Sequence, residues 1–330
     1  MTRVALLGGG FMARTHAQSY AALTDRAQVA VVCALEGADA IAAELGAEVA
    51  SDWEAVVAMD GIDAVDVCLP TPLHRPVAEA ALAAGKHVLL EKPIALTLDD
   101  ADAIGDAARA NGRVLMVGHV LRYMPEIVEL RRLLDTGELG RPLAATALRL
   151  SAPPDWNQWM LDPAKSGGVL VDMMVHDFDI LNAVLGPAQT VVARAAADNR
   201  HFQMLLEHPG GNGAIEGSHA MPGSYPFTAN LRVLCEHGVL EHRFVAGAGD
   251  QVDEAMQSVL GVHPADGEAR RFHEATDPWG AQIAHFLECV SGGGEPRDGS
   301  FAQARAALAV ALAARAAAES GEPQNVNPGH

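Results

Sequence analysis

One apolar stretch near the middle of the chain carries ionisable groups at helical spacing. In "SGGVLVDMMVHDFDIL", which runs from Ser166 to Leu181, most residues are apolar and predict a buried helix. Asp172 and His176 are four residues apart and therefore share one helix face, and Asp179 lies near the same stripe. A buried charge is costly unless it is paired. The pattern indicates either a catalytic Asp172–His176 pair or a structural one. We expect no metal site, because no further ligand cluster accompanies the pair, and a structural role for Asp179.

A lysine follows an apolar run in the first third of the chain. "KHVLLEKPIALT" places Glu91, Lys92 and Pro93 directly after a predicted strand. In an open parallel sheet, ligands bind outside the carboxyl ends of the strands. Glu91 and Lys92 are therefore expected at a cofactor cleft, and the alternative is a surface lysine that precedes a proline. A lysine can give up its proton, whereas an arginine cannot.

A glycine loop opens the chain. In "VALLGGGFMA", Gly8, Gly10 and Ala13 fit the pattern G-x-G-x-x-G/A between a strand and a helix. The first glycine makes the tight turn, the second lets backbone N–H groups approach a pyrophosphate, and the third position must be small. The start of the helix adds partial positive charge. We expect Gly8, Gly10, Phe11 and Met12 to contact a dinucleotide.

The choice of dinucleotide depends on the end of the second predicted strand. An acidic residue is expected there, roughly 20 residues after the glycine loop, to hold the ribose hydroxyls. "VVCALEG" has Ala34 at that position and Glu36 two residues further. Residues 34–38 contain no basic side chain, and Glu36 would repel a 2′-phosphate. The sequence favours NAD and leaves NADP open.

Secondary candidates lie on predicted loops. "CLPTPLHRP" offers Thr71 and His74, which either line the cofactor cleft or form a proline-rich turn with a helix cap. "GHVLRYMP" puts Arg122 at the domain junction, where it either contacts substrate or holds the domains together. "PPDWNQWM" offers Trp156 as a flat apolar face for a sugar ring and Asn157 for hydroxyls, or else aromatic anchors for a long loop.

The elements that must position these residues fall into two patterns. Up to about residue 120, apolar strand-like runs alternate with helical segments joined by short links, which is typical of a doubly wound parallel sheet, the Rossmann architecture. Between residues 188 and 245 the β-type runs repeat, and helical segments close the chain. We therefore expect an α/β dinucleotide-binding domain at 1–120 and an α+β domain with an antiparallel or mixed sheet at 121–330.

Composition excludes several classes of protein. The formal net charge of −19 leaves no basic face for nucleic acid. Cys33, Cys68, Cys235 and Cys289 have no CxxC spacing and are expected to be reduced core residues. The sequence has no run of roughly 18 consecutive apolar residues that would span a membrane, and its beginning is not typical of a signal peptide. We expect a cytoplasmic protein without membrane or nucleic-acid partners.

Taken in order, the motifs resemble one known family. "GGGFMARTHA", "PTPLH", "EKP", "GHVLRYMPE" and "SGGVLVDMMVHDFDIL" are similar to the glucose–fructose oxidoreductase/inositol dehydrogenase/MocA family, and the match continues to "WGAQIAHFLECVSGGGEP". The resemblance implies an NAD(P)-dependent oxidoreductase acting on a polyol or sugar hydroxyl. It also implies a second domain with a large open sheet used in oligomerisation, hence a homodimer or homotetramer. Ala13, Ala34 and Met174 depart from the commonest pattern, and Met174 is expected to change the pocket wall.

The resemblance assigns the family's lysine to Lys92, its aspartate to Asp172 and its histidine to His176. We hypothesise that His176 takes the hydroxyl proton, Lys92 stabilises the developing alkoxide, and Asp172 orients the substrate. Lys92 as the base is the alternative. Other readings are a catalytically silent dinucleotide-binding regulator and a reductase of a non-sugar carbonyl or imine. The substrate contacts expected are Lys92, Arg122, Trp156, Asn157, Asp172 and His176.

Overall fold

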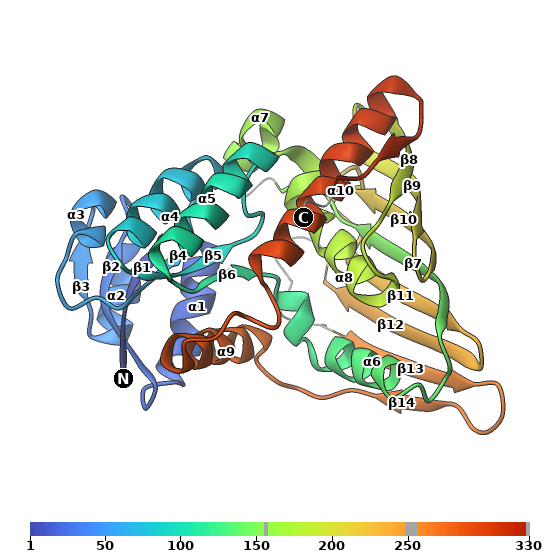
Figure 1. Cartoon of the computed structure of the whole chain (residues 1–330), viewed down its shortest axis with the longest axis horizontal. Coiled ribbons are helices and arrows are strands. Elements are labelled where there is room, and N and C mark those ends of the chain that lie inside the picture. The colour runs from blue at the N-terminus through green and yellow to red at the C-terminus, as the bar shows by residue number, and fades with distance from the viewer. Residues whose placement is uncertain (155–157, 248–256, 328–330) are drawn as a thin grey trace. The chain divides into compact units, whose positions relative to one another are not determined.

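The chain divides into two compact units, each built on its own sheet (Figure 1). The computed structural model describes residues 1–154, 158–247 and 257–327. The first unit comprises Met1–Tyr123 and Asp277–Arg305, and the second comprises Met124–Thr276 and the residues from Ala306 onward. The chain first changes unit between Tyr123 and Met124, next to the boundary expected at residue 120. Residues 277–305, which the sequence placed in the second domain, are grouped with the first unit.

The first unit contains a six-stranded parallel sheet in the order β3-β2-β1-β4-β5-β6. Its strands are β1 (Thr2–Leu7), β2 (Ala27–Cys33), β3 (Glu48–Ala50), β4 (Ala64–Val67), β5 (His87–Glu91) and β6 (Leu115–Gly118). Its helices are α1 (Phe11–Ala21), α2 (Ala38–Leu45), α3 (Trp53–Val57), α4 (His74–Ala83), α5 (Leu98–Asn111) and α9 (Pro278–Gly292), with short turns at η1 (Thr71–Leu73) and η2 (Val120–Tyr123). This strand order is that of the doubly wound dinucleotide-binding fold. The predicted Rossmann architecture is confirmed.

Local sequence explains where these helices begin and end. The side chain of Asp52 caps α3, and that of Thr97 caps α5. Gly46 ends α2 in the left-handed conformation, with φ of 64°, which glycine adopts without steric cost. Ile283, Phe286 and Leu287 of α9 join the core formed by α1, β1 and β2. Contacts distant in sequence therefore complete the hydrophobic core of the first unit.

The second unit contains a nine-stranded sheet in the order β14-β13-β12-β11-β7-β10-β9-β8-β15. Its strands are β7 (Pro142–Leu150), β8 (Thr190–Ala196), β9 (His201–His208), β10 (Gly211–Ser218), β11 (Phe227–Cys235), β12 (Gly238–Ala246), β13 (Gln257–Pro264), β14 (Arg270–Phe272) and β15 (Gln324–Asn325). Every neighbouring pair is antiparallel except β7 with β10. The expected large, mainly antiparallel sheet is confirmed.

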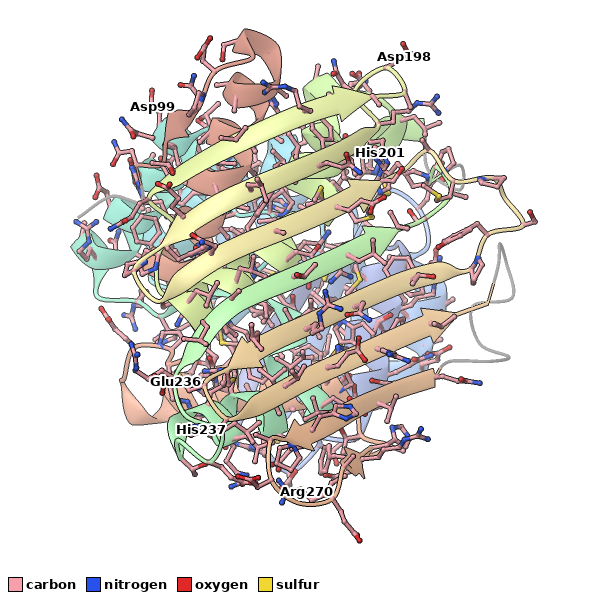
Figure 2. All side chains as sticks on the ribbon, turned by 90° about the vertical axis from the view of Figure 1, so that its right-hand side faces the viewer. Asp99, Asp198, His201, Glu236, His237 and Arg270 are labelled. Atoms are coloured by element: carbon pink, nitrogen blue, oxygen red, sulfur yellow. The ribbon has the colours of Figure 1, made fainter. Side chains whose placement is uncertain are left out.

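Helices pack on one face of this sheet. Its helical segments are α6 (Pro125–Asp135), η3 (Gln158–Leu161), α7 (Pro163–Ser166), η4 (Val169–Met173), α8 (Val175–Leu185) and the larger part of α10 (Phe301–Ser320). Helix α8 contacts β7 and β10, and α6 contacts β12 and β13. Buried and exposed residues alternate along β9, as a strand with one covered face requires. Figure 2 shows the opposite face, over which no helix of the described residues passes.

Helix α10 is rich in alanine and unusually apolar. It is long and apolar enough by length and composition to be a membrane-span candidate, a test that the core helices of soluble proteins also pass. Half of its most apolar window is buried inside the molecule. Arg305 pairs with Asp102, and Arg315 donates a hydrogen bond to the carbonyl oxygen of Gly167 at 2.7 Å. These contacts are those of a helix that packs against its own chain.

Candidate active site

The three glycines of the first loop meet different surroundings. Gly8 has φ of 136°, and a Cβ there would lie 2.4 Å from the carbonyl oxygen of Cys68. A Cβ on Gly9 would lie 1.9 Å from the carbonyl oxygen of Glu36. At Gly10, by contrast, no atom of the described chain beyond its two neighbours in sequence lies within 4 Å of that position. Gly8 and Gly9 are required by the packing of the protein, whereas Gly10 leaves its backbone open to a ligand.

The loop fits a dinucleotide pyrophosphate. Helix α1 begins at Phe11 directly after Gly10, so its unpaired N–H groups face the open position. Phe11 is 67% exposed, Met12 is partly exposed, and Ala13 is fully buried, as close packing of helix and strand requires. Sequence reasoning missed the role of Gly9, although the run of three glycines was a signal for it. The loop that Gly9 touches carries Ala34 and Glu36, and Glu36 is exposed.

Other predicted cofactor residues lie at the same edge of the sheet. Strand β4 pairs in parallel with β1 and with β5, so their carboxyl ends are adjacent. Thr71 follows β4 and is buried, Glu91 ends β5, and Lys92 comes next. The backbone N–H of Lys92 donates to Glu91 Oε2 at 3.2 Å, and the Lys92–Pro93 peptide is cis. The structure therefore brings Gly8, Thr71, Glu91 and Lys92 to one sheet edge.

His74 is buried between two backbone carbonyls. Its Nδ1 lies 2.8 Å from the oxygen of Pro93, and its Nε2 lies 2.9 Å from the oxygen of Leu69. Burial lowers the pKa of His74 despite these two contacts. The side chain ties the loop after β4 to the loop after β5. This geometry gives His74 a structural role, and its direct contact with the cofactor stays a prediction.

Asp172 and His176 lie in the second unit on either side of a helical irregularity. Asp172 belongs to the π-helical turn η4, marked by the hydrogen bond from Met174 N to Val169 O, five residues back. His176 lies in the first turn of α8. Asp172 is 8% exposed, and His176 is partly exposed. The continuous α-helix predicted over residues 166–181 is wrong, because a π turn followed by a new helix replaces it.

Two contacts hold this segment on its sheet. Asp177 accepts hydrogen bonds from Arg149 of β7 at 2.7 and 3.0 Å, and both side chains are buried. Met174 is fully buried, and its sulfur lies 2.1 Å from the position that a Cβ on Gly217 of β10 would take. Met174 therefore packs against the sheet, where Gly217 leaves room for it. The expectation that it changes the pocket wall finds no support in this contact.

Two of the predicted substrate contacts lie outside the described residues, and a third has a structural partner. Trp156 and Asn157 fall in the first undescribed segment. Arg122 is buried and donates to Asp298 Oδ1 at 3.0 Å. Next to it, the Tyr123 hydroxyl contacts His285 Nδ1 at 2.8 Å. Arg122 thus fastens two distant segments of the first unit, and its contact with substrate stays a prediction.

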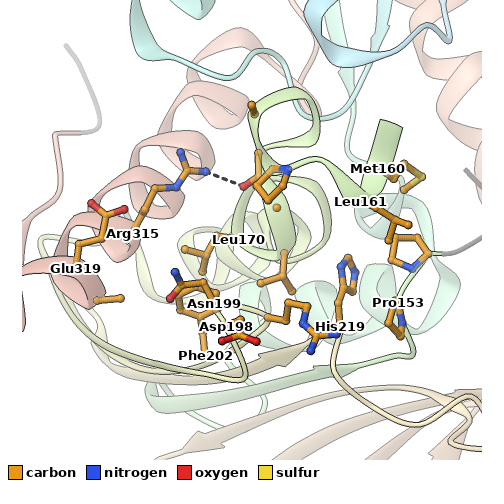
Figure 3. A pocket seen from close by; sticks show the side chains of 18 residues that line it. Pro153, Met160, Leu161, Leu170, Asp198, Asn199, Phe202, His219, Arg315 and Glu319 are labelled. Carbon is orange, nitrogen blue, oxygen red and sulfur yellow. Dashed lines mark hydrogen bonds between the residues drawn. The ribbon is translucent and has the colours of Figure 1, made fainter. Parts of the chain in front are cut away.

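A cavity of about 410 Å³ lies within the second unit (Figure 3). Leu170, Phe202, His219, Arg200, Arg315 and Glu319 are among the residues that line it. Its rim includes Asp198 and Asn199, which with Ala197 form a left-handed turn of three non-glycine residues. The dashed line in Figure 3 marks the bond from Arg315 to Gly167. Asp172 and His176 are not among the residues that line the cavity. Arg315 of α10 holds Gly167, shortly before η4, and both residues line the cavity.

A buried histidine–carboxylate pair lies on α1 and β4, close in sequence to the glycine loop and to the end of β4. His16 of α1 is fully buried, as is Asp66 of β4, and His16 Nδ1 lies 2.8 Å from Asp66 Oδ2. The four cysteines are free, as expected, and one of them, Cys68, adjoins this pair. Ligand atoms of His16, Asp66 and Cys68 lie within 4.8 Å of one another, a grouping able to hold a metal ion. No motif in the sequence marks His16 or Asp66 as functional.

Both units match models of known protein families. Residues 2–119 match a family model described as "Oxidoreductase family, NAD-binding Rossmann fold", and residues 127–241 match the "GFO/IDH/MocA C-terminal domain". The 1,5-anhydro-D-fructose reductase of Ensifer adhaerens is 30% identical, with 84% of this chain and 83% of the relative covered. The scyllo-inositol 2-dehydrogenase (NAD(+)) of Bacillus subtilis strain 168 is 29% identical, with 89% and 87% covered.

Solved structures agree in fold. The crystal structure of an oxidoreductase domain protein from Kribbella flavida superimposes with a TM-score of 0.86 at 23% identity, covering 99% of this chain and 100% of that one.

Proposed function

The chain belongs to the Gfo/Idh/MocA family of NAD-binding oxidoreductases, and from this premise we propose that it transfers a hydride between NAD and a secondary hydroxyl of a cyclic polyol or sugar. One observation supports this most. Gly10, whose backbone is open, comes after β1, and Lys92 comes after β5, at the same edge of one parallel sheet. Relatives named after inositol and anhydrofructose support the substrate class.

The chemistry proposed for the chain's own residues is acid–base and electrostatic. NAD held at the glycine loop would supply the acceptor for the hydride. His176 takes the proton of the hydroxyl, since a histidine titrates near neutral pH and is partly accessible here. Lys92 places its ammonium group against the substrate oxygen, where negative charge develops. Asp172 accepts a hydrogen bond from a neighbouring hydroxyl. In the alternative assignment, Lys92 is the base.

The reverse reaction, reduction of a carbonyl, is a second candidate activity. One relative is named as a reductase and another as a dehydrogenase, so carbonyl reduction with NADH is the alternative activity. A binding module without catalysis would need the glycine loop alone. It would have no use for Lys92, Asp172 and His176 together.

Substitutions at Lys92 and His176 test the catalytic assignment. Absorbance at 340 nm is followed with a panel of inositols, hexoses and anhydrosugars, in both directions. Lys92→Arg and His176→Ala should each lower kcat by about 10²- to 10⁴-fold, the usual contribution of a positioned acid or base. The dissociation constant for NAD, measured by fluorescence titration, should stay within about threefold in His176→Ala. This change is well below the tenfold that corresponds to about 1.4 kcal/mol of binding free energy.

The matched control is Lys165→Arg, at an exposed lysine of α7. Turnover close to that of the unchanged protein in both Lys92→Arg and His176→Ala would end the proposal.

The same titration with NADP tests the cofactor preference, because Glu36 is exposed beside the glycine loop and no residue from 34 to 38 is basic. Tighter binding of NADP than of NAD would contradict it. We also propose a cytoplasmic homo-oligomer.

A further inference from the structure

A buried histidine connects three elements of the first unit. His16 lies on α1, one turn after the glycine loop, and its side chain is inaccessible to solvent. Its Nδ1 lies 2.8 Å from Asp66 Oδ2 on β4 and 3.5 Å from the sulfur of Cys68, just beyond β4. Its Nε2 lies 3.3 Å from Oε1 of Glu91 at the end of β5. One imidazole therefore stands between two carboxylates.

A positive charge on His16 would stabilise both carboxylates that contact it. Two buried carboxylates that contact the same imidazole are costly without a compensating positive charge. Burial by itself lowers the pKa of His16, but the charge of Asp66 and its hydrogen bond reverse this and raise the pKa well above 6.5. Burial and the charge of Asp66 raise the pKa of Cys68 to about 12, so this side chain is a neutral thiol. Burial and Asp66 also raise the pKa of Tyr20 and keep it neutral. An imidazolium at His16 is the one cation among these groups.

The carboxylate of Glu91 is held from several sides. Its Oε1 faces His16, and its Oε2 accepts the backbone N–H of Lys92 at 3.2 Å. Glu91 pairs across the sheet with Gly118, and a Cβ on Gly118 would lie 2.6 Å from Glu91 Oε1. The missing side chain at Gly118 therefore provides the space that the carboxylate occupies. Any shift of Glu91 acts directly on the backbone from which the Lys92 side chain departs.

We propose that His16 is a positioning residue for Lys92: its imidazolium bridges Asp66 and Glu91, and Glu91 in turn fixes the backbone of Lys92 at the carboxyl end of β5. The inference rests on the proposed function, because it gives Lys92 a position that must be exact. It also couples that position to α1, the helix whose N-terminus faces the dinucleotide. A displacement of about 1 Å of a catalytic group can cost on the order of 10²-fold in rate.

A metal ion at His16, Asp66 and Cys68 is the competing explanation of the cluster. The 2.8 Å contact between His16 and Asp66 is already that of a charge-assisted hydrogen bond. The hydrogen-bonded arrangement therefore accounts for the donors without a metal.

Two near-isosteric substitutions separate the two sides of the imidazole. His16→Asn keeps an N–H group at the Nδ1 position toward Asp66 and loses the one toward Glu91. His16→Gln puts its amide nitrogen near the Nε2 position and keeps the contact with Glu91. With NAD saturating, kcat should fall by about 10- to 100-fold in His16→Asn and less in His16→Gln. The NAD dissociation constant should change little in either variant.

A double-mutant cycle shows whether His16 acts through Glu91. Adding His16→Asn to Glu91→Gln should leave kcat at the level of Glu91→Gln alone, since the route to Lys92 is already interrupted. Gly118→Ala, which displaces the Glu91 carboxylate without removing it, should lower kcat as well. His273→Asn provides the control, because His273 forms a histidine–carboxylate pair with Glu126 in the second unit, at 2.9 Å. Independent, additive losses in the cycle would overturn the proposal.

The unaltered protein provides a readout that does not depend on turnover. In ¹⁵N-histidine NMR of the NAD-bound protein at pH 7, both ring nitrogens of His16 should be protonated. A neutral His16 would overturn the proposal even if every variant failed to fold, and so would one equivalent of bound metal by elemental analysis. If Lys92→Arg and His176→Ala both keep full turnover, the proposed function itself fails. If Lys92 is essential but His16→Asn turns over normally, only this inference fails.

Discussion

At the scale of single residues, the glycine loop shows how one residue type serves two purposes. Gly8 and Gly9 lie against backbone oxygens at distances that exclude a side chain, whereas Gly10 lies in open space. The motif assigns roles to Gly8 and Gly10 and none to Gly9. Their surroundings divide them into positions that the fold needs and a position that a ligand needs.

The pair Gly9→Ala and Gly10→Ala tests this division. In Gly9→Ala the new Cβ would overlap the carbonyl oxygen of Glu36, so the backbone must shift, at a cost of about 1–3 kcal/mol in the free energy of unfolding. Gly10→Ala meets no neighbour among the described residues and has φ of −84°, which alanine adopts freely. It should leave Tm unchanged and weaken NAD binding by about tenfold, or ~1.4 kcal/mol.

Thermal unfolding and fluorescence titration of NAD measure the two effects separately. Each variant acts as the control of the other. Equal losses of Tm in both would mean that Gly10 is also held by the fold, and the assignment of the phosphate position would then be lost.

At the scale of elements, the segment before α8 differs most from its sequence pattern. Apolar periodicity over residues 166–181 predicts one helix, but η4 is a π turn and α8 begins only at Val175. Met174 lies at the junction and fills the space above Gly217, while Arg149 holds Asp177. Packing against β7 and β10 thus determines how the helix is wound, and helical spacing alone does not relate Asp172 to His176.

Strands β12 and β13 carry a pH-sensitive contact. His242 Nε2 lies 3.0 Å from the Ser258 hydroxyl, and burial lowers the pKa of His242 from 6.5 to about 4. The charge of Glu126 opposes this shift, and that of Arg149 adds to it. Below pH 6.5, His242 binds a proton in the unfolded chain but stays neutral in the folded chain until the pH approaches 4. The free energy of unfolding is therefore undiminished above pH 6.5 and falls as the pH drops toward 4.

His242→Gln should remove this acid sensitivity, because an amide keeps a hydrogen bond to Ser258 but does not titrate. Between pH 7 and pH 5, the unchanged protein should lose about 2 kcal/mol more of its unfolding free energy than the variant. Urea unfolding at the two pH values measures the difference. His237→Gln, at an exposed histidine, is the control. Parallel losses in the unchanged protein and in His242→Gln would show that His242 does not titrate in this range.

At the scale of the whole molecule, the described residues leave one face of the large sheet uncovered. On β9, Leu205 is 63% exposed and alternates with the buried Met204 and Leu206. It pairs across the strands with Val192 of β8 and Ala214 of β10. A row of apolar side chains on the uncovered face of a sheet is typical of an interface. We expect this face to pair with that of a second copy, as the proposed homo-oligomer requires.

Leu205→Lys should shift the protein from oligomer to monomer, because it places a charge in the buried centre of that interface. Size-exclusion chromatography with light scattering at micromolar concentration measures the change. Val49→Lys on the edge strand β3 of the first unit, where Val49 is 52% exposed, should leave the mass unchanged. A monomeric unchanged protein would contradict the expectation at once.

The sequence by itself determined the alternating strands and helices, the glycine loop and the position of Lys92 after β5. These follow from local rules, namely hydrophobic period, helix caps and the conformational freedom of glycine. It could not reveal that residues 277–305 return to the first unit, that His74 is fixed between two carbonyls, or that Arg122 pairs with Asp298. It also missed His16 of α1, whose partners Asp66 and Glu91 lie on β4 and β5. Only the tertiary structure decides such contacts, because burial and partner distance depend on which distant segments fold together.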